Sequence, residues 1–201
     1  MSTNDADLVH LTELLSLARV LPVLRLPTAD EALAAVDACA SAGAVVVELT
    51  TTTPGWADAV SAARRRWPGL AIGVGTVTTT AHARVALERG VDFLVSPYPV
   101  PHVRESLPAG AVLVEGGMTV AEVVAAGAHG LAKLFPAHVG GPAFLRSVLA
   151  VAPGVRIIPT GGIQLASVDE WLAAGAYAVG VGTDLLAQPD LGAALARFAR
   201  S

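Results

Sequence analysis

Short, almost continuous apolar runs recur along the chain, and stretches with helical periodicity separate them. Strands that are buried on both faces of a sheet have sequences of this kind. The eight predicted strands are residues 20–24, 45–47, 70–74, 93–95, 111–114, 131–134, 155–158 and 176–179. The glycines just before the last seven runs are Gly43, Gly69, Gly90, Gly110, Gly127, Gly154 and Gly175. Each one suits the left-handed conformation that ends a helix before a strand begins.

The segments between these strands predict helices, two of which begin with a capping-box pattern. These two pairs are Thr28 with Glu31 and Thr119 with Glu122. The predicted helices cover 32–42, 57–66, 80–89, 120–126, 143–150, 168–174 and 191–200, with a shorter one within 97–107.

Strands and helices that alternate in this way indicate an α/β fold with a parallel sheet. Eight such units in 201 residues predict a single-domain (β/α)8 TIM barrel over residues 1–201. The alternative is an open doubly wound sheet. No Gly-x-Gly-x-x-Gly motif follows the first predicted strand, which makes that alternative the weaker prediction.

Composition narrows the classes of partner. The 53% hydrophobic content supplies a large core, and the net charge of −4 gives no basic surface for nucleic acid. The apolar runs are shorter than the roughly 20 residues of a membrane span, and the polar, acidic segment 1–7 does not resemble a signal peptide. We therefore expect a soluble cytoplasmic protein with a small-molecule substrate. The single cysteine and five scattered histidines predict neither a disulfide nor a metal site.

Lys133 is the only lysine in the chain, since the other twelve basic residues are arginines. It stands within an apolar run that reads as a buried strand. An apolar setting penalises the ammonium form, and a neutral amine attacks a carbonyl carbon to form a Schiff base. The alternative is a buried stem whose charged head reaches water.

Polar residues gather where the predicted strands end, which is where TIM barrels carry their active sites. These positions include Arg25, Glu48, Thr76, Pro97, Glu115, Phe135, Thr160 and Thr183. Glu48 follows three valines, and a carboxylate in such a setting suits proton transfer. Glu115 also follows an apolar run, so its position suits proton transfer equally well. Either glutamate could instead be solvated.

Glycine turns follow the last two predicted strands, at Gly161-Gly162 and at Gly180-Val181-Gly182-Thr183. TIM barrels often bind phosphate at this place through backbone N–H groups that only glycine lets a ligand approach. The Arg25 guanidinium can donate two parallel hydrogen bonds to a carboxylate, although a single arginine is more often a surface residue. His138 follows the lysine strand and is a weaker candidate for the same mouth.

Several motifs together identify a resemblance. They are Pro22-Val23-Leu24-Arg25, Val47-Glu48-Leu49-Thr50, Gly73-Val74-Gly75-Thr76-Val77, Phe93-Leu94-Val95-Ser96-Pro97, Lys133-Leu134-Phe135-Pro136-Ala137, Pro159-Thr160-Gly161-Gly162-Ile163 and Val179-Gly180-Val181-Gly182. The sequence resembles the 2-keto-3-deoxy-6-phosphogluconate (KDPG) and 4-hydroxy-2-oxoglutarate (KHG) aldolases and their phosphogalactonate relatives.

The resemblance implies a class I aldolase of Entner–Doudoroff type on a (β/α)8 barrel, commonly a homotrimer, with no cofactor and no metal. It implies that Lys133 forms the Schiff base, that Glu48 is the general acid/base and that Thr76 holds the pyruvate carboxylate. It places Thr160, Gly161, Gly162, Gly182 and Thr183 around the distal phosphate. Pro97 and Phe135 belong to the matching segments and are expected to contact substrate.

Two positions depart from the family pattern. Many members have an arginine four residues after the catalytic glutamate, where this chain has Thr52. Thr52 is expected to contact substrate, and the carboxylate falls to Arg25 with Thr76. The loop after the fifth strand usually reads Pro-Gly, whereas here it is Glu115-Gly116. A carboxylate at the mouth could repel an anionic substrate or select another aldehyde. A phosphosugar isomerase or epimerase and a non-catalytic sugar-acid binding protein remain the alternatives.

Overall fold

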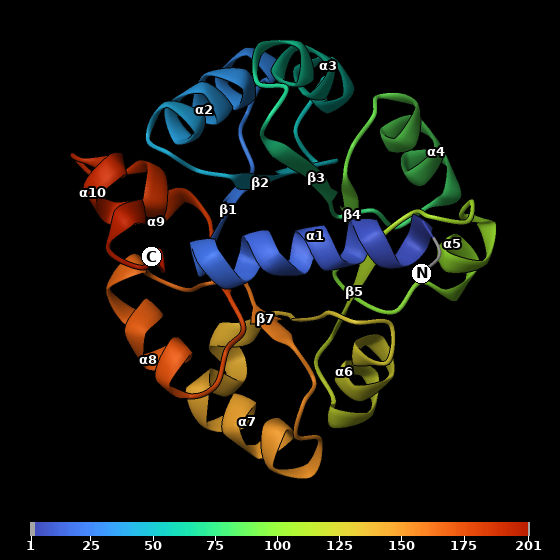
Figure 1. Ribbon diagram of the computed structural model, residues 1–201, viewed down its shortest axis with the longest axis vertical. Coiled ribbons are helices and arrows are strands. Elements are labelled where there is room, and N and C mark those ends of the chain that lie inside the picture. Colours follow the sequence, from blue (N-terminus) through green and yellow to red (C-terminus); the bar gives the residue numbers. More distant parts are fainter. Residues whose placement is uncertain (1–2, 201) are drawn as a thin grey trace.

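Eight parallel strands form the centre of the molecule, and helices surround them (Figure 1). The computed structural model describes residues 3–200. The strands are β1 (Val20–Leu24), β2 (Val46–Thr50), β3 (Ala71–Gly75), β4 (Phe93–Val95), β5 (Leu113–Gly117), β6 (Ala132–Leu134), β7 (Ile157–Pro159) and β8 (Val179–Val181). They pair in the order β7-β6-β5-β4-β3-β2-β1-β8, and a bridge between Thr160 and Gly180 closes the ring. The predicted TIM barrel is confirmed.

The helices lie outside this ring, with one exception at its end. They are α1 (Thr3–Ala18), α2 (Ala29–Ser41), α3 (Trp56–Arg66), α4 (Thr80–Glu88), α5 (Pro101–Ser106), α6 (Val120–Gly127), α7 (Ala137–Val151), the 3₁₀ turn η1 (Leu165–Ser167), α8 (Val168–Ala173), α9 (Thr183–Leu186) and α10 (Leu191–Ala196). Gly141 interrupts α7 with a non-helical backbone. None of the helices in the described part of the chain is long and apolar enough to cross a membrane.

The predicted helix starts are largely confirmed. Thr119 and Glu122 form a complete capping box, whereas Thr28 accepts a hydrogen bond from the Glu31 backbone N–H without the reciprocal bond. The left-handed glycines occur at Gly43, Gly90, Gly110, Gly154 and Gly175. The prediction is wrong for Gly69, and for Gly127 because that helix continues and Gly130 takes the left-handed conformation.

Most strands begin and end a few residues later than the apolar runs predict. Strand β2 includes Glu48 and Thr50, and β5 includes Glu115. A polar residue was expected to end each strand, because buried strands are nearly all apolar. In this barrel the polar residues lie within the upper part of the strands, where ladder hydrogen bonds continue past them.

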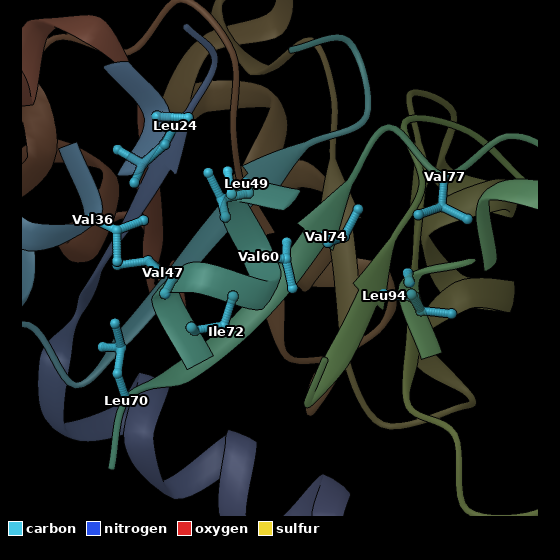
Figure 2. Packing of buried hydrophobic residues seen from close by; sticks show 14 of the residues in the cluster. Leu24, Val36, Val47, Leu49, Val60, Leu70, Ile72, Val74, Val77 and Leu94 are labelled. Carbon is cyan, nitrogen blue, oxygen red and sulfur yellow. The ribbon is translucent and has the colours of Figure 1, made fainter. Parts of the chain in front are cut away.

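Alternate strand residues face the helices and form the outer core. Figure 2 shows Val47, Leu49 and Ile72 turned toward Val36 of α2 and Val60 of α3. All five side chains are fully buried. A second outer cluster lies under α6, α7 and α8 on the other side of the barrel. Because the outer residues hold the helices to the strands, the inward residues are left to shape the interior.

The lower half of the barrel interior is apolar, and α1 closes its end. In Figure 1 this helix lies across the barrel opening. Leu11 and Leu15 are 3% and 1% exposed and pack against the interior residues Leu21 and Phe93. The Tyr177 hydroxyl also donates to a carbonyl of α1 at 2.9 Å. Water is therefore kept out of the barrel from this end, and access is from the opposite one.

Candidate active site

A cavity of about 610 Å³ opens at the end of the barrel opposite α1. Its walls come from residues on or just after every strand except β5. The predicted site residues that line it are Arg25, Glu48, Thr76, Pro97, Lys133, Phe135, Thr160, Gly161, Gly162, Gly182 and Thr183. Thr52 is the only predicted site residue that does not line the cavity. Barrel closure thus brings together residues from widely separated parts of the chain.

Lys133 lies at the bottom of this cavity with its amine buried. The residue is 6% exposed, and its Nζ donates a hydrogen bond to Glu48 Oε1 over 3.2 Å. The Phe135 ring lies beside it, with its centroid 5.6 Å from Nζ. The alternative in which the charged head reaches water is wrong, because the amine ends inside the barrel. An amine held there is placed to meet a ligand that enters from the mouth.

Glu48 is 1% exposed and lies within β2 rather than at its end. Glycine on the next strand makes room for its carboxylate, since a Cβ at Gly75 would lie 1.9 Å from Oε1. Among the described residues Oε2 has no hydrogen-bond partner. Buried polar atoms are rarely left unpaired. This oxygen is therefore the one available to a substrate hydroxyl or a water molecule.

Apolar side chains lie directly beneath the Lys133–Glu48 pair. Leu21, Phe93 and Ile158 bound a very small void that the two polar residues cover from above. The pair therefore separates an apolar interior from an open cavity. Electrostatic interactions are stronger where water is excluded, so a charge that forms here is felt strongly by both groups.

Thr76 follows β3 in a conformation that is unusual for a β-branched residue, with φ of 60°. The Thr51 hydroxyl donates to the Thr76 carbonyl at 2.7 Å and holds this backbone. Arg25 Nη2 donates to Thr76 Oγ1 over 3.4 Å. Strained residues of this kind cluster at binding and catalytic sites. A hydroxyl and a guanidinium side by side are suited to a carboxylate.

The opposite wall is formed by glycine turns after β7 and β8. Gly161 and Gly162 have φ of 96° and 68°, and a Cβ on Gly162 would lie 2.5 Å from His138 Nδ1. The backbone N–H groups of Gly161, Gly162 and Thr183 donate to no other described residue. Free N–H groups at glycine turns bind anions. This wall can therefore hold an anionic group at the far end of a ligand.

The match to protein families is decisive. Residues 11–193 match the family model described as KDPG and KHG aldolase. The chain belongs to this family. Its members are pyruvate-forming class I aldolases, which are carbon–carbon lyases, and the resemblance found from the motifs is confirmed.

Similar proteins carry three related names. The aldolase is 34% identical over 160 residues to the 2-dehydro-3-deoxy-phosphogluconate aldolase of Pseudomonas aeruginosa, covering 78% of this chain and 73% of that protein. It is 31% identical to the 2-dehydro-3-deoxy-6-phosphogalactonate aldolase of Escherichia coli, with 83% of each chain covered. A KHG/KDPG aldolase of Escherichia coli is 30% identical over 80% of this chain and 77% of its own length.

Solved structures have the same fold. The KDPG aldolase of Zymomonas mobilis superposes with a TM-score of 0.80 at 29% identity, covering 94% of this chain and 97% of that one. The KDPG aldolase of Legionella pneumophila, with pyruvate captured as a covalent carbinolamine, has a TM-score of 0.83 at 24% identity over 94% and 98% of the two chains.

Two expectations about the mouth of the aldolase need correction. Thr52 is exposed and reaches the cavity only through Thr50, whose hydroxyl lies 3.0 Å from its own. Glu115 points outward, where it accepts hydrogen bonds from Val100 N–H and Arg104 Nε at 2.8 and 2.7 Å. It therefore does not line the cavity, and the hypothesis that it repels an anionic substrate is wrong.

Thr50 and Tyr98 line the cavity although the sequence did not indicate them, and His138, the weaker candidate from the sequence, lines it as well. Thr50 could have been found, because it stands two residues after Glu48 and strand residues two apart share a face. Tyr98 lies in a loop that has no such periodicity, and His138 lies in the first turn of α7, where the period of a strand gives no guide. Thr160 is buried and lies deeper than its expected place, beside Lys133 and Glu48.

Proposed function

We propose that this aldolase cleaves a 2-keto-3-deoxy sugar acid with a distal phosphate, of the KDPG type, to pyruvate and an aldehyde such as glyceraldehyde 3-phosphate. The observation that carries the proposal is the buried contact of 3.2 Å between Lys133 Nζ and Glu48 Oε1 at the bottom of the cavity. One group is a nucleophile and the other moves protons, and they lie within reach of the same ligand atom.

Lys133 attacks the C2 carbonyl of the substrate as the neutral amine and forms a carbinolamine. Glu48 gives a proton to the departing hydroxyl, which leaves as water, and a protonated imine remains. The Glu48 carboxylate then takes the proton of the C4 hydroxyl. The C3–C4 bond breaks, the aldehyde is released, and the electron pair moves through C3 to the imine nitrogen. Protonation of C3 and addition of water return pyruvate and the free amine.

The two walls of the cavity supply the binding roles in this proposal. Arg25 and Thr76 hold the carboxylate next to C2, where the guanidinium balances its charge. The free N–H groups after β7 and β8 take the phosphate. Pro97 and Phe135 form the apolar sides between them. Phosphogalactonate-type and KHG-type substrates are the alternatives, since relatives of all three names are similar to this chain.

Reductive trapping tests the role of Lys133. Borohydride added with pyruvate should attach one reduced pyruvyl group to the intact protein, because hydride reduces an imine to a stable amine. Lys133 is the only lysine, so a digest locates the adduct without ambiguity. We expect no adduct in Lys133→Ala or in Lys133→Arg, where a guanidinium keeps its proton. An equal adduct in Lys133→Ala would refute the Schiff-base assignment, and no adduct in the native protein would favour a phosphosugar isomerase.

Pyruvate release from a panel of substrates tests the substrate class. The panel compares KDPG, its galactonate isomer, 4-hydroxy-2-oxoglutarate and an unphosphorylated 2-keto-3-deoxy acid. We expect the phosphorylated acids to have the higher kcat/KM, because only their phosphate can accept hydrogen bonds from the free N–H groups of the turns after β7 and β8. Equal values with and without phosphate would contradict the phosphate assignment while leaving the Lys133 chemistry intact.

We further propose that the aldolase forms a homotrimer. The proposal is supported by the family resemblance and by exposed valines on α6 and α7, namely Val120, Val124, Val139 and Val151. Interfaces between identical subunits bury apolar side chains in their core. Light scattering should give about three times the chain mass of 20.3 kDa. A single chain mass at working concentration would overturn this assignment.

A further inference from the structure

Glu115 and Arg104 form a partly buried ion pair on the outer side of β5. Glu115 is 7% exposed, and its Oε2 accepts from Arg104 Nε at 2.7 Å. Arg104 also donates to the Leu113 carbonyl at 3.1 Å, and the second carboxylate oxygen of Glu115 accepts from the Val100 backbone N–H at 2.8 Å. Both oxygens of Glu115 are therefore satisfied by groups that lie on or just before α5. Hydrogen bonds between ionised groups are stronger than those between neutral groups.

The segment that this pair holds carries part of the cavity wall. Residues 96–100 connect β4 to α5, and Pro97 and Tyr98 from this segment line the cavity. The other end of the segment is also tied to β5, since Ser96 N–H donates to the Val114 carbonyl at 3.0 Å. Strand β5 contributes no cavity-lining residue of its own. It acts on the cavity by holding the segment that does.

A glycine on the same strand allows the segment to lie this close. A Cβ at Gly116 would be 2.4 Å from the carbonyl carbon of Pro97, so the backbone of the segment rests directly on β5. Within the segment, the Ser96 hydroxyl donates to the Tyr98 carbonyl at 2.7 Å. Tyr98 itself is 52% exposed. The point from which its side chain enters the cavity wall is set by the backbone of this segment.

We propose that Glu115 is a positioning residue, which through Val100 and Arg104 fixes Pro97 and Tyr98 in the cavity wall and so determines how tightly substrate is bound. This inference rests on the proposed function for its activity readout. It assigns Glu115 no contact with substrate. Lys133 and Glu48 lie on β6 and β2, outside the segment. Loss of the anchor therefore raises KM and leaves the imine chemistry in place.

Steady-state kinetics of four variants provide the test. They are Glu115→Gln, Glu115→Ala, Arg104→Ala and, as the matched control, Glu105→Ala on the exposed face of the same helix. We expect Glu115→Ala and Arg104→Ala to raise KM about tenfold with kcat within about twofold, as small displacements of a binding wall do. Glu115→Gln keeps an acceptor for Val100 and should give an intermediate KM. Glu105→Ala should match the native protein.

Coupling between residues shows whether the effect passes through the segment. Tyr98→Ala should raise KM on its own, and its combination with Glu115→Gln should raise KM no further, because groups that act as one unit are not additive. Hydrogen exchange should be faster at the Val100 amide in Glu115→Ala. Borohydride trapping at saturating pyruvate should be unchanged in every variant.

Two results would overturn the inference. One is a folded Glu115→Gln with faster Val100 exchange or a lower melting temperature and an unchanged KM, since the pair would then serve stability alone. The other is full additivity with Tyr98→Ala. Failure of the proposed function has a different signature, because the native protein itself would then trap no imine and release no pyruvate.

Discussion

The chemistry of this aldolase depends on two side chains that are buried together at the bottom of one cavity. Lys133 Nζ and Glu48 Oε1 are 3.2 Å apart although 85 residues separate them in the sequence. A buried amine and carboxylate stabilise a protein weakly, since each loses its hydration. The presence of the buried Lys133–Glu48 pair is therefore better explained by function than by a contribution to stability. Its two members should fail in different ways when each is replaced alone.

Replacing Glu48 with glutamine should separate binding from turnover. The amide keeps the shape of the side chain but cannot take the C4 proton, so we expect kcat to fall by about 10²- to 10⁴-fold. The imine with pyruvate should still be trapped by borohydride. Glu88→Gln, on the exposed face of α4, is the control and should keep full activity. Retained turnover in Glu48→Gln would move the acid/base role to another group.

The single thiol should be inert in the folded protein. Burial raises the pKa of Cys39 from 9.0 to about 11, and only the thiolate reacts readily. At about pH 8 Ellman's reagent should therefore modify Cys39 only after unfolding. Fast modification of the native protein would contradict the burial.

The same shift makes stability depend on pH in a defined window. The folded state holds the proton more tightly than the unfolded state, so this contribution is complete below pH 9.0 and is lost as pH rises toward about 11. The difference in unfolding free energy between the native protein and Cys39→Ala should be constant at neutral pH and should shrink across that window.

At the scale of elements, most of the helices could be predicted from the sequence, but α1 could not. Capping residues such as Thr28 and Thr119 mark helix starts locally, which is why α2 and α6 begin where expected. The polar residues of segment 1–7 gave no helical pattern that would predict α1. The leucines of α1 are buried only because the barrel end that they cover is apolar. Short-range pattern thus predicts an element that caps itself, but not one whose partner is formed by eight distant strands.

The closing role of α1 can be tested with two leucines on the same helix. Leu15 is 1% exposed and Leu17 is 50% exposed. Leu15→Ala leaves a cavity at the barrel end and should lower the free energy of unfolding by about 2–5 kcal/mol. Leu17→Ala should change it by about 0.5 kcal/mol or less. Equal effects in urea unfolding would mean that α1 does not close the barrel.

At the scale of the whole molecule, ring closure assembles the site from residues with no local relation. The carboxylate wall comes from β1 and β3, the anion wall from β7 and β8, and the amine and acid/base from β6 and β2. A TIM barrel places such residues at one mouth because all its parallel strands end there. Eleven of the twelve predicted positions meet in this way, which is why strand counting was enough to predict the mouth.

The sequence by itself determined the alternation of strands and helices, the unique lysine and the family motifs. The strand pattern alone could not distinguish the two glutamates, because Glu48 and Glu115 each follow an apolar run of the same kind, and only the family resemblance indicated Glu48. Strand register decided between them. Glu48 pairs with Val23 and faces the cavity, whereas Glu115 pairs with Ala132 of the outer core.

The physical reason is the period of two along a strand. A shift of one residue turns a side chain from one face of the sheet to the other, and both strands continue past the point where their apolar runs end. Local sequence does not specify that register. Pairing with neighbours and closure of the barrel do, and they make one glutamate a catalytic candidate and the other an anchor for the cavity wall.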